Sequence, residues 1–392
     1  MKRKRQLLYL FILACLLAIA TPAGAGLLSQ EIDLNQMGEA YELNLDSQGM
    51  LWVSDSVSGE IWQVDPESGD YTIFPVGGGP SDARGDGAGH AWWVDFNTNR
   101  LGRLTLGVAQ VDVDIWEIPE EPSELSGLYS TAIDSEGDIW FTDYYDPKLY
   151  ELDPDQAKDN LCVYDLPDLG LGIYMAISGQ NLWLGDTWNG RLLRLDTADD
   201  ATHTFTWWQL PANSYPQGIA VDGAGQVWWA DTTLGTVGRL VPGEPTYTAF
   251  DPPDIDPLND QTPQMLALRG DQVWVSLQNT GGIGVLDQAT ASFQEPAVTS
   301  DDAPVTPTCS DLAATIHSTL DPTPIPVDAS WINLSYPTAL EQDGWRIFSS
   351  PEGAVPWGIA SASEMWMVDQ GRQKLARLEF GGNLYLPVVV KP

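Results

Sequence analysis

The side chains that could do chemistry in this chain are mainly carboxylates that recur at one place in a repeated phrase. If the repeats pack side by side, these carboxylates gather toward one face, where their oxygens could hold Ca²⁺ or Mg²⁺. The alternative is structural, because a carboxylate at a turn also accepts backbone hydrogen bonds or pairs with an arginine of the next segment (Arg103, Arg194, Arg239 or Arg377). A residue repeated so often is more typical of the repeat than of one site. The candidate metal ligands are Asp55, Asp95, Asp143, Asp186, Asp231 and Asp369.

A second group of candidates stands at the starts of short apolar segments. Three are aromatic, and a stacking platform for a sugar or a cyclic ligand is the chemistry that they offer; packing is the alternative. Two glutamines occupy the same position after a proline. Asp82 and Arg84 lie two positions apart on another such segment, where they form an ion pair or an anion contact. The uncharged candidates are Tyr41, Tyr129, Gln217, Gln264 and Trp357.

The phrase that carries the aspartates is a repeat. Val227-Trp228-Trp229-Ala230-Asp231 is one copy, and similar phrases recur about every 45 residues along most of the chain. Self-similarity at this period is typical of propellers and other repeat folds. The repeated tryptophans are therefore expected to pack between neighbouring units.

Each phrase lies inside a unit of four short apolar segments. In one copy, Gly218 to Val221 is followed by the turn Asp222-Gly223-Ala224-Gly225, then by the tryptophan segment, by Val237 to Leu240 and by Tyr247 to Pro252. An aspartate that caps its own turn and a glycine that accepts positive φ predict hairpins. Four strands per unit without helical periodicity predict an all-β fold, a β-propeller of four-stranded blades.

Counting the phrases predicts seven blades over residues 26–381. The step before the last phrase has twice the usual length, and a Pro/Thr/Asp-rich stretch at 295–343 lacks the blade phrases, so we expect an insertion in blade six. The last unit has three strands. Residues 29–34 look like a fourth strand, and pairing the two ends would close the ring and remove its open edges.

The two ends of the chain predict export. Basic residues at 2–5, an apolar run at 7–20 and Ala23-Gly24-Ala25 form a secretory signal peptide over residues 1–25, with cleavage after Ala25. Residues 382–392 form an apolar tail that is too short to span a bilayer, so we expect no transmembrane segment in the mature chain. The tail either packs on the rim or serves as a sorting segment.

The charge excludes some partners. With 18 Lys+Arg against 55 Asp+Glu the formal net charge is -37, and so negative a surface repels nucleic acid and anionic membranes. We expect a secreted monomer whose partner is a small molecule, a glycan or an extracellular protein.

Two cysteines, Cys162 and Cys309, remain after signal cleavage. They fall in blades three and six, nearly opposite in a seven-membered ring. A disulfide needs Cα atoms within about 7 Å, so a bridge would require the insertion to fold across a face. We therefore expect two free or peripheral thiols.

The repeat resembles that of the virginiamycin B (streptogramin) lyase family, in Pro216-Gln217-Gly218-Ile219-Ala220 and in the tryptophan phrase that follows. The resemblance implies a seven-bladed propeller and a magnesium-dependent elimination that opens a cyclic depsipeptide. It also implies that His and Glu on one face bind the metal and supply the base, each His following the proline that starts an inner strand. Here the corresponding positions hold no histidine but Tyr41, Ser81, Tyr129, Ile173, Gln217, Gln264 and Trp357.

The histidines of this chain, His90, His203 and His317, fall in a hairpin, in a fourth strand and in the insertion. A base must reach the substrate within hydrogen-bond distance, and none is placed for that. We therefore expect a non-catalytic, lyase-like binding propeller without a certain cofactor. The alternative is a metal-dependent lyase or a lactonase-type hydrolase that uses the aspartates with Arg84 or Glu42, and Ca²⁺ or Mg²⁺ is the ion that it would need.

Overall fold

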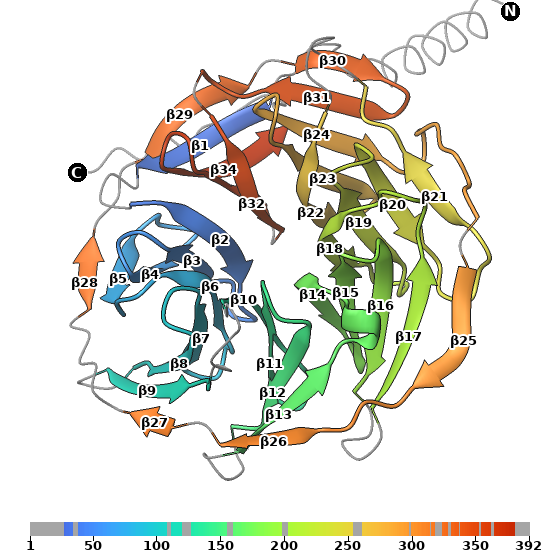
Figure 1. Cartoon of the computed structure of the whole chain (residues 1–392). Helices are drawn as coiled ribbons and strands as arrows, with labels where there is room; N and C mark the ends of the chain where they lie inside the picture. Colours follow the sequence, from blue (N-terminus) through green and yellow to red (C-terminus); the bar gives the residue numbers. More distant parts are fainter. Residues whose placement is uncertain are drawn as a thin grey trace, which may run out of the picture.

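The computed structural model describes residues 27–33, 38–107, 111–119, 127–154, 160–197, 203–253, 261–297, 299–313, 315–317, 324–327, 331–336, 338–352, 354–361 and 364–380. These residues form seven antiparallel sheets arranged around a central axis (Figure 1). The expected seven-bladed propeller is thus confirmed. The signal peptide and the tail at 382–392 lie outside the described residues. Within the described part, no helix is both long and apolar enough to cross a membrane.

Each blade is built on four strands, which in blades one to six follow sequence order from the axis outward. In the first four blades these strands are β2 (Ala40–Leu45), β3 (Leu51–Asp55), β4 (Glu60–Val64) and β5 (Tyr71–Pro75); β6 (Pro80–Gly85), β7 (His90–Asp95), β8 (Arg100–Thr105) and β9 (Asp112–Glu117); β10 (Leu128–Ile133), β11 (Ile139–Asp143), β12 (Lys148–Leu152) and β13 (Asn160–Asp165); and β14 (Gly172–Ser178), β15 (Asn181–Asp186), β16 (Arg191–Asp196) and β17 (Thr204–Gln209).

Blades five and six continue the pattern, and blade seven joins the two ends of the chain. The strands are β18 (Pro216–Val221), β19 (Val227–Asp231), β20 (Thr236–Leu240) and β21 (Tyr247–Phe250); β22 (Pro263–Arg269), β23 (Gln272–Leu277), β24 (Gly282–Asp287) and β31 (Trp345–Ser349); and β32 (Pro356–Ser361), β33 (Met365–Asp369), β34 (Lys374–Phe380) and β1 (Leu27–Asp33). β1 pairs with β34, so the expected closure by the N-terminal strand is confirmed.

The repeated sequence explains the first hairpin of a blade. In blade one, the carboxylate of Asp46 accepts hydrogen bonds from the backbone N–H groups of Gln48 and Met50. It also accepts one from the indole Nε1 of Trp52, six residues later, at 2.9 Å. Asp134 with Trp140 and Asp222 with Trp228 repeat this contact. The turn aspartate thus fixes the turn and the tryptophan together.

The tryptophans pack between blades, as expected. Trp52 of blade one lies in one buried cluster with Ala83 and Trp93 of blade two, and Trp92 of blade two packs with Leu128 and Ile139 of blade three. These indoles are almost fully buried. Burial of such large aromatic areas is the main source of stability for a stack of sheets.

Two of the arginines that were expected to pair with the strand-two aspartates, Arg103 and Arg194, contact other groups among the described residues, so this part of the structural interpretation is wrong for them. Arg103 stacks on Trp92 and Trp116, and it binds Asp114 on the adjacent strand. Arg194 stacks on Trp183 and Trp208 in the same way. Guanidinium groups lie well on aromatic faces, and the paired strand places an indole directly opposite each arginine.

The insertion of blade six follows the outer edge of the ring (Figure 1, orange). We call the described residues between 294 and 342 the belt. It joins β24 to β31 and adds a fifth strand to six of the seven sheets. Its strands are β25 (Thr299–Val305), β26 (Ser310–Ala313), β27 (Thr315–His317), β28 (Ile325–Val327), β29 (Trp331–Tyr336) and β30 (Thr338–Gln342).

The expectation of free cysteines is wrong. Cys162 and Cys309 form a disulfide, with their Cα atoms 5.0 Å apart. A bridge between these blades was expected only if the insertion crossed a face of the disc. Instead the belt runs around the rim, where β26 pairs with β13, the outer strand of blade three, and Cys309 stands beside this pair.

A buried polar cluster joins the closing strand to its neighbours. Arg372 follows β33 and donates hydrogen bonds to both carboxylate oxygens of Glu31 on β1, at 3.0 and 2.8 Å. It also binds Asp369 at 2.6 Å. The hydroxyl of Tyr336, on the belt strand β29, donates to Glu31 at 2.8 Å. Three segments far apart in sequence are thus held at one point.

Candidate functional site

The inner strands position the candidate side chains, and each of them is irregular at the same point. The register against strand two shifts near the second and third residues of all seven inner strands, as between Ala40 and Leu43 in blade one. A bulge re-aims side chains and is common beside functional sites. The seven shifts occur where the inner strands surround the axis (Figure 1).

Hydroxyl side chains of strand two hold some of these bulges and join neighbouring blades. In blade one, Ser54 accepts a hydrogen bond from the backbone N–H of Glu42 and donates one to the carbonyl of Ser81 in blade two. Thr142 bridges blades three and four in this way, and Ser276 bridges blades six and seven. Because these contacts are buried, they fix the inner strands relative to one another.

Five of the expected binding residues surround one cavity of about 430 Å³. They are the uncharged candidates Tyr41, Tyr129, Gln217, Gln264 and Trp357, contributed by five different blades. We call this cavity the mouth. Asp82 and Arg84 are not among its lining residues. The remaining lining residues are Phe96, Tyr144, Tyr145, Ile173 and Tyr215.

Three tyrosines form a hydroxyl chain at the mouth. The Tyr41 and Tyr129 hydroxyls are 2.8 Å apart, and those of Tyr129 and Tyr174 are 3.1 Å apart. Burial raises the pKa of Tyr41 to about 12, against a smaller opposing effect of the Tyr129 hydrogen bond, and burial also raises the pKa values of Tyr129 and Tyr174. The three phenols therefore stay neutral at physiological pH and act as hydrogen-bond groups, not as bases.

Glu42 is a buried carboxyl group beside this chain of hydroxyls. Burial, and next the negative charge of Asp82, raises the pKa of Glu42 to about 8; Tyr174, Trp357 and Arg84 oppose this shift. Its Oε1 atom is buried and lacks a hydrogen-bond partner among the described residues. At neutral pH the side chain is therefore mostly a neutral acid.

The expectation of an ion pair between Asp82 and Arg84 is wrong, because no such contact exists among the described residues. Asp82 accepts hydrogen bonds from Asn44 and from both the backbone N–H and the hydroxyl of Thr131. Its oxygens are thus occupied by the two neighbouring blades. The Nε of Arg84 is buried without a described partner, and its charge lowers the pKa of Glu42. The alternative of an anion contact for Arg84 stays a prediction.

The six strand-two aspartates serve the loops of their own blades. Asp55 accepts hydrogen bonds from the backbone N–H groups of Gly38, Glu39, Val57 and Ser58. Asp95, Asp143, Asp186, Asp231 and Asp369 likewise bind the loop before the inner strand and the turn after strand two. Among the described residues, no group of three or more His, Cys, Asp or Glu side chains could hold a metal ion. This geometry favours the turn interpretation over the metal interpretation.

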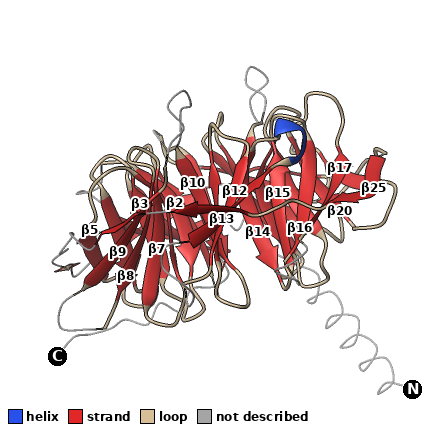
Figure 2. Cartoon of the chain, turned by 60° about the horizontal axis from the view of Figure 1, so that its bottom comes forward, coloured by secondary structure: helices blue, strands red, loops and turns tan. Residues whose placement is uncertain are grey.

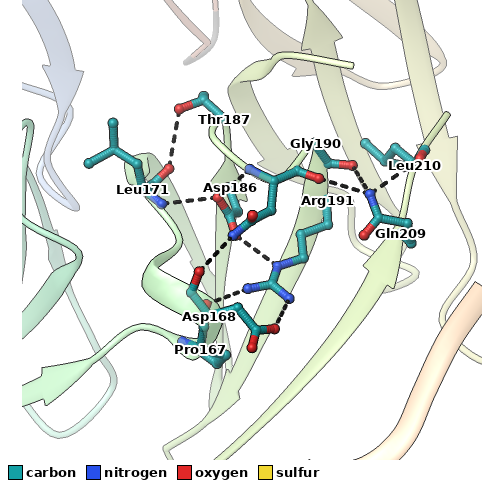
Figure 3. A network of polar contacts seen from close by, with 10 residues as sticks. Pro167, Asp168, Leu171, Asp186, Thr187, Gly190, Arg191, Gln209 and Leu210 are labelled. Atoms are coloured by element: carbon teal, nitrogen blue, oxygen red, sulfur yellow. Dashed lines mark hydrogen bonds and ion pairs between the residues drawn. The ribbon is translucent and has the colours of Figure 1, made fainter. Parts of the chain in front are cut away.

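Blade four shows how firmly such a loop is held (Figure 3). The buried guanidinium of Arg191 binds Asp186 at 2.7 Å, Asp168 at 3.0 Å and the carbonyl of Pro167. Pro167 starts the short 3₁₀ helix η1 (Pro167–Leu169), the only helix among the described residues. The adjacent turn carries Trp188, which is 77% exposed. Trp188 is not among the residues that line the mouth.

Sequence reasoning missed the aromatic residues that the loops bring to the mouth. Phe96 and Tyr144 each come directly after a strand-two aspartate, and Tyr215 comes directly before the proline that starts an inner strand. An aromatic residue directly after the strand-two aspartate, or directly before the proline, was the sequence signal that could have identified them. They extend the cluster of Tyr129, Ile173 and Tyr174.

Replacing Glu42 by Gln tests the protonation of this buried acid. A folded-state pKa above the unfolded value means that the folded chain keeps a proton that the unfolded chain has lost, so raising the pH between about 4.5 and 8 destabilises the folded state. Because glutamine does not titrate, the Glu42→Gln variant does not lose stability in this way as the pH rises. Its stability relative to the natural chain should therefore rise over this window by a few kcal/mol, at about 1.4 kcal/mol per pKa unit. Urea unfolding of both proteins across the window measures the difference, and a constant difference would contradict the assignment.

Comparison with known proteins supports the fold. No family profile matches the chain. A virginiamycin B lyase of Nocardia farcinica is 25% identical over 223 residues, which cover 56% of this chain and 72% of that protein. A catalytically inactive histidine-to-alanine variant of virginiamycin B lyase from Staphylococcus aureus, solved with quinupristin, has a TM-score of 0.64 at 19% identity, covering 90% of this chain and 99% of the other.

Two further structures agree. A streptogramin B lyase has a TM-score of 0.63 at 18% identity over 91% of this chain and 98% of its own. YCF48 from Cyanidioschyzon merolae has a TM-score of 0.58 at 11% identity, over 90% and 98%. Together with the seven sheets and their closure, these likenesses show that the chain is a streptogramin-lyase-like seven-bladed β-propeller.

Proposed function

We propose that this chain is a secreted propeller that binds a ring-shaped organic ligand at the mouth without chemically altering it. The observation that carries the proposal is the convergence of Tyr41, Tyr129, Gln217, Gln264 and Trp357 from five blades on one cavity. Concave sites with aromatic walls and a few placed polar groups are typical of small-molecule binding. The disulfide supports secretion, because such bonds persist in oxidising compartments.

The polar groups of the mouth support a ligand rich in amides or hydroxyls. The Oε1 atom of Gln264 is buried without a hydrogen-bond partner in the described part of the chain. A buried acceptor without a partner costs free energy, and a ligand with a hydrogen-bond donor would satisfy this atom. The ring centroids of the neighbouring Tyr41 and Trp357 are 5.9 Å apart, and the two rings provide an apolar wall.

The residues of the mouth support binding over the lyase reaction. The staphylococcal lyase is inactive when one histidine is replaced by alanine, and the described residues that line the mouth include no histidine. His90 lies in a hairpin and contacts Asp86. His203 packs against Trp140 and Tyr164, away from the lining residues. The side chain of His317 lies outside the described residues.

A magnesium ion, which the lyase resemblance implies, does not fit the described residues. Mg²⁺ prefers carboxylates and water in octahedral geometry. The lining residues offer phenols, amides and an indole, and the six aspartates bind their own loops. We therefore expect the thermal midpoint of the protein to be the same with Mg²⁺, with Ca²⁺ and with chelator.

The second candidate function is catalysis of acid–base type, and Glu42 is the observation that favours it. A carboxyl group with a pKa near 8 is matched to proton transfer close to neutral pH. Such an enzyme would convert its ligand, whereas a binding protein would release it unchanged.

Titration with quinupristin tests the proposal and separates the two functions. Isothermal titration calorimetry measures binding, and chromatography with mass spectrometry then examines the recovered ligand. We expect saturable binding and unchanged quinupristin. An elimination product would keep the mass but elute elsewhere, and a hydrolysis product would gain one water. Turnover to either product would establish catalysis, and absence of binding would contradict the ligand class.

Replacing Trp357 by Ala should weaken the affinity for quinupristin about tenfold or more. The change removes one aromatic wall, and an aromatic contact of this kind is worth on the order of 1 kcal/mol beyond its buried area. Calorimetry of the variant measures the loss. Trp188→Ala is the matched control, because Trp188 is exposed and is not a lining residue. Equal affinities of the two variants would argue against binding at the mouth.

A further inference from the structure

The belt makes one circuit of the propeller. Leaving β24, it contacts blade five through the bridges Ala249 to Gln294 and Thr246 to Ala297. It then pairs with the outer strands of blades four, three, two and one, and with the closing strand β1 of blade seven. It ends beside blade six, where β30 pairs with β31. Figure 2 shows β25 along the rim of the disc, outside β17 and β20.

The two ends of the circuit meet. The backbone N–H of Asp287, at the end of β24, donates to the carbonyl of Gly344 at 2.9 Å, and that of Ser292 donates to the carbonyl of Asp343 at 3.2 Å. β24 and β31 are themselves paired strands. The belt is therefore a loop that closes around the ring of blades.

The contacts of the belt are unequal along its path. Among the described residues it forms three residue pairs with each of blades one and two, and four with blade three. On β1 it forms six pairs, from Leu27 with Tyr336 to Ile32 with Trp331. Short strands at a sheet edge open readily. The single covalent attachment, Cys162 to Cys309, lies in this weakly paired part, on blade three.

The strong end of the belt covers the point where the ring closes. β1, the N-terminal strand that closes blade seven, lies between β34 and β29. It is therefore an interior strand of that sheet. Without β29, β1 would become an edge strand. Tyr336 of β29 is fully buried, and its hydroxyl donates a hydrogen bond to Glu31 of β1. Arg372 binds the same Glu31.

From these contacts we propose that the belt is a redox-sensitive strap. The Cys162–Cys309 disulfide keeps the belt on the rim, and the belt keeps β1 in blade seven, so that reduction of this one bond increases opening of the ring at β1. Dithiothreitol would supply two electrons and two protons, breaking the S–S bond to give two thiols, while it is itself oxidised to its cyclic disulfide. The blades would stay folded, because their own strands do not depend on the bond.

Hydrogen exchange with mass spectrometry of the full secreted chain tests this proposal. After reduction, amides of β26, β27, β29 and β1 should exchange about tenfold faster or more, whereas amides of β3, β11 and β19 should not change. Cys162→Ala/Cys309→Ala should reproduce this pattern without reductant and should show no further response to it. That variant separates the effect of the bond from other effects of the reagent.

A second variant examines the belt end by itself. Tyr336→Phe removes one hydroxyl at Glu31 and leaves the disulfide intact, so it should speed exchange in β1 and β29 but not in β26. Three results would overturn the proposal: unchanged exchange in β1 after reduction, faster exchange in β26 alone, or simultaneous loss of protection in all seven blades.

Discussion

Replacement of Arg372 by Met should lower the free energy of unfolding by about 3–5 kcal/mol, because it removes the guanidinium that two buried carboxylates share. Glu31 and Asp369 are 1% and 0% exposed, and Arg372 binds both. Methionine has a similar length but offers no donor. Guanidinium chloride unfolding, followed by tryptophan fluorescence, measures the change.

Arg100→Met is the matched control for this prediction. Arg100 pairs with Glu117 at 3.1 Å, but both side chains are about two-fifths exposed. Exposed pairs contribute only about 0–1 kcal/mol. If the two variants lose equal stability, the cluster around Glu31 does not hold the ring closed in the way described.

Replacement of Trp52 by Ala should destabilise the protein by about 3–5 kcal/mol, the usual cost of deleting a buried indole. Trp52 is fully buried between blades one and two, where it packs with Ala83 and Trp93. The change also removes the donor to Asp46. The backbone bonds of Asp46 to Gln48 and Met50 remain, so the hairpin should persist while the contact between blades weakens.

Trp188→Ala provides the comparison in the same unfolding experiment. Trp188 is 77% exposed on the loop of blade four, and exposed substitutions usually change stability by about 0.5 kcal/mol or less. A loss for Trp52→Ala as small as that for Trp188→Ala would show that the repeated tryptophans are not the packing residues between blades.

The ring itself could be predicted from the sequence because its signals are local and repeated. A turn aspartate, a glycine and a tryptophan at fixed spacing define a hairpin, and the count of such phrases defines the number of blades. The closing strand β1 followed from the same count. The structure has it at Leu27–Asp33.

The belt and its disulfide could not be predicted, because their partners are distant. Residues 294–342 lack the blade phrase, and each belt strand is specified by the edge that it meets on a different blade. Cys162 and Cys309 are separated by 147 residues. Neither composition nor spacing distinguishes a path across the face from a path around the rim.

The mouth was predicted in part. Register along the inner strands was sufficient for Tyr41, Tyr129 and Trp357, because strand position determines which side chains face the axis. The same reasoning failed for Asp82, whose carboxylate accepts hydrogen bonds from the neighbouring Asn44 and Thr131. It could not give the protonation of Glu42, which depends on burial and on the charge of Asp82 from the next blade.

A crystal structure of the protein with quinupristin tests the central claim most directly. We predict intact ligand within the mouth, stacked on Trp357 and Tyr41, with a hydrogen bond to the side-chain oxygen of Gln264. Ligand bound elsewhere on the disc, or a ring-opened product in the mouth, would contradict the account of a binding propeller.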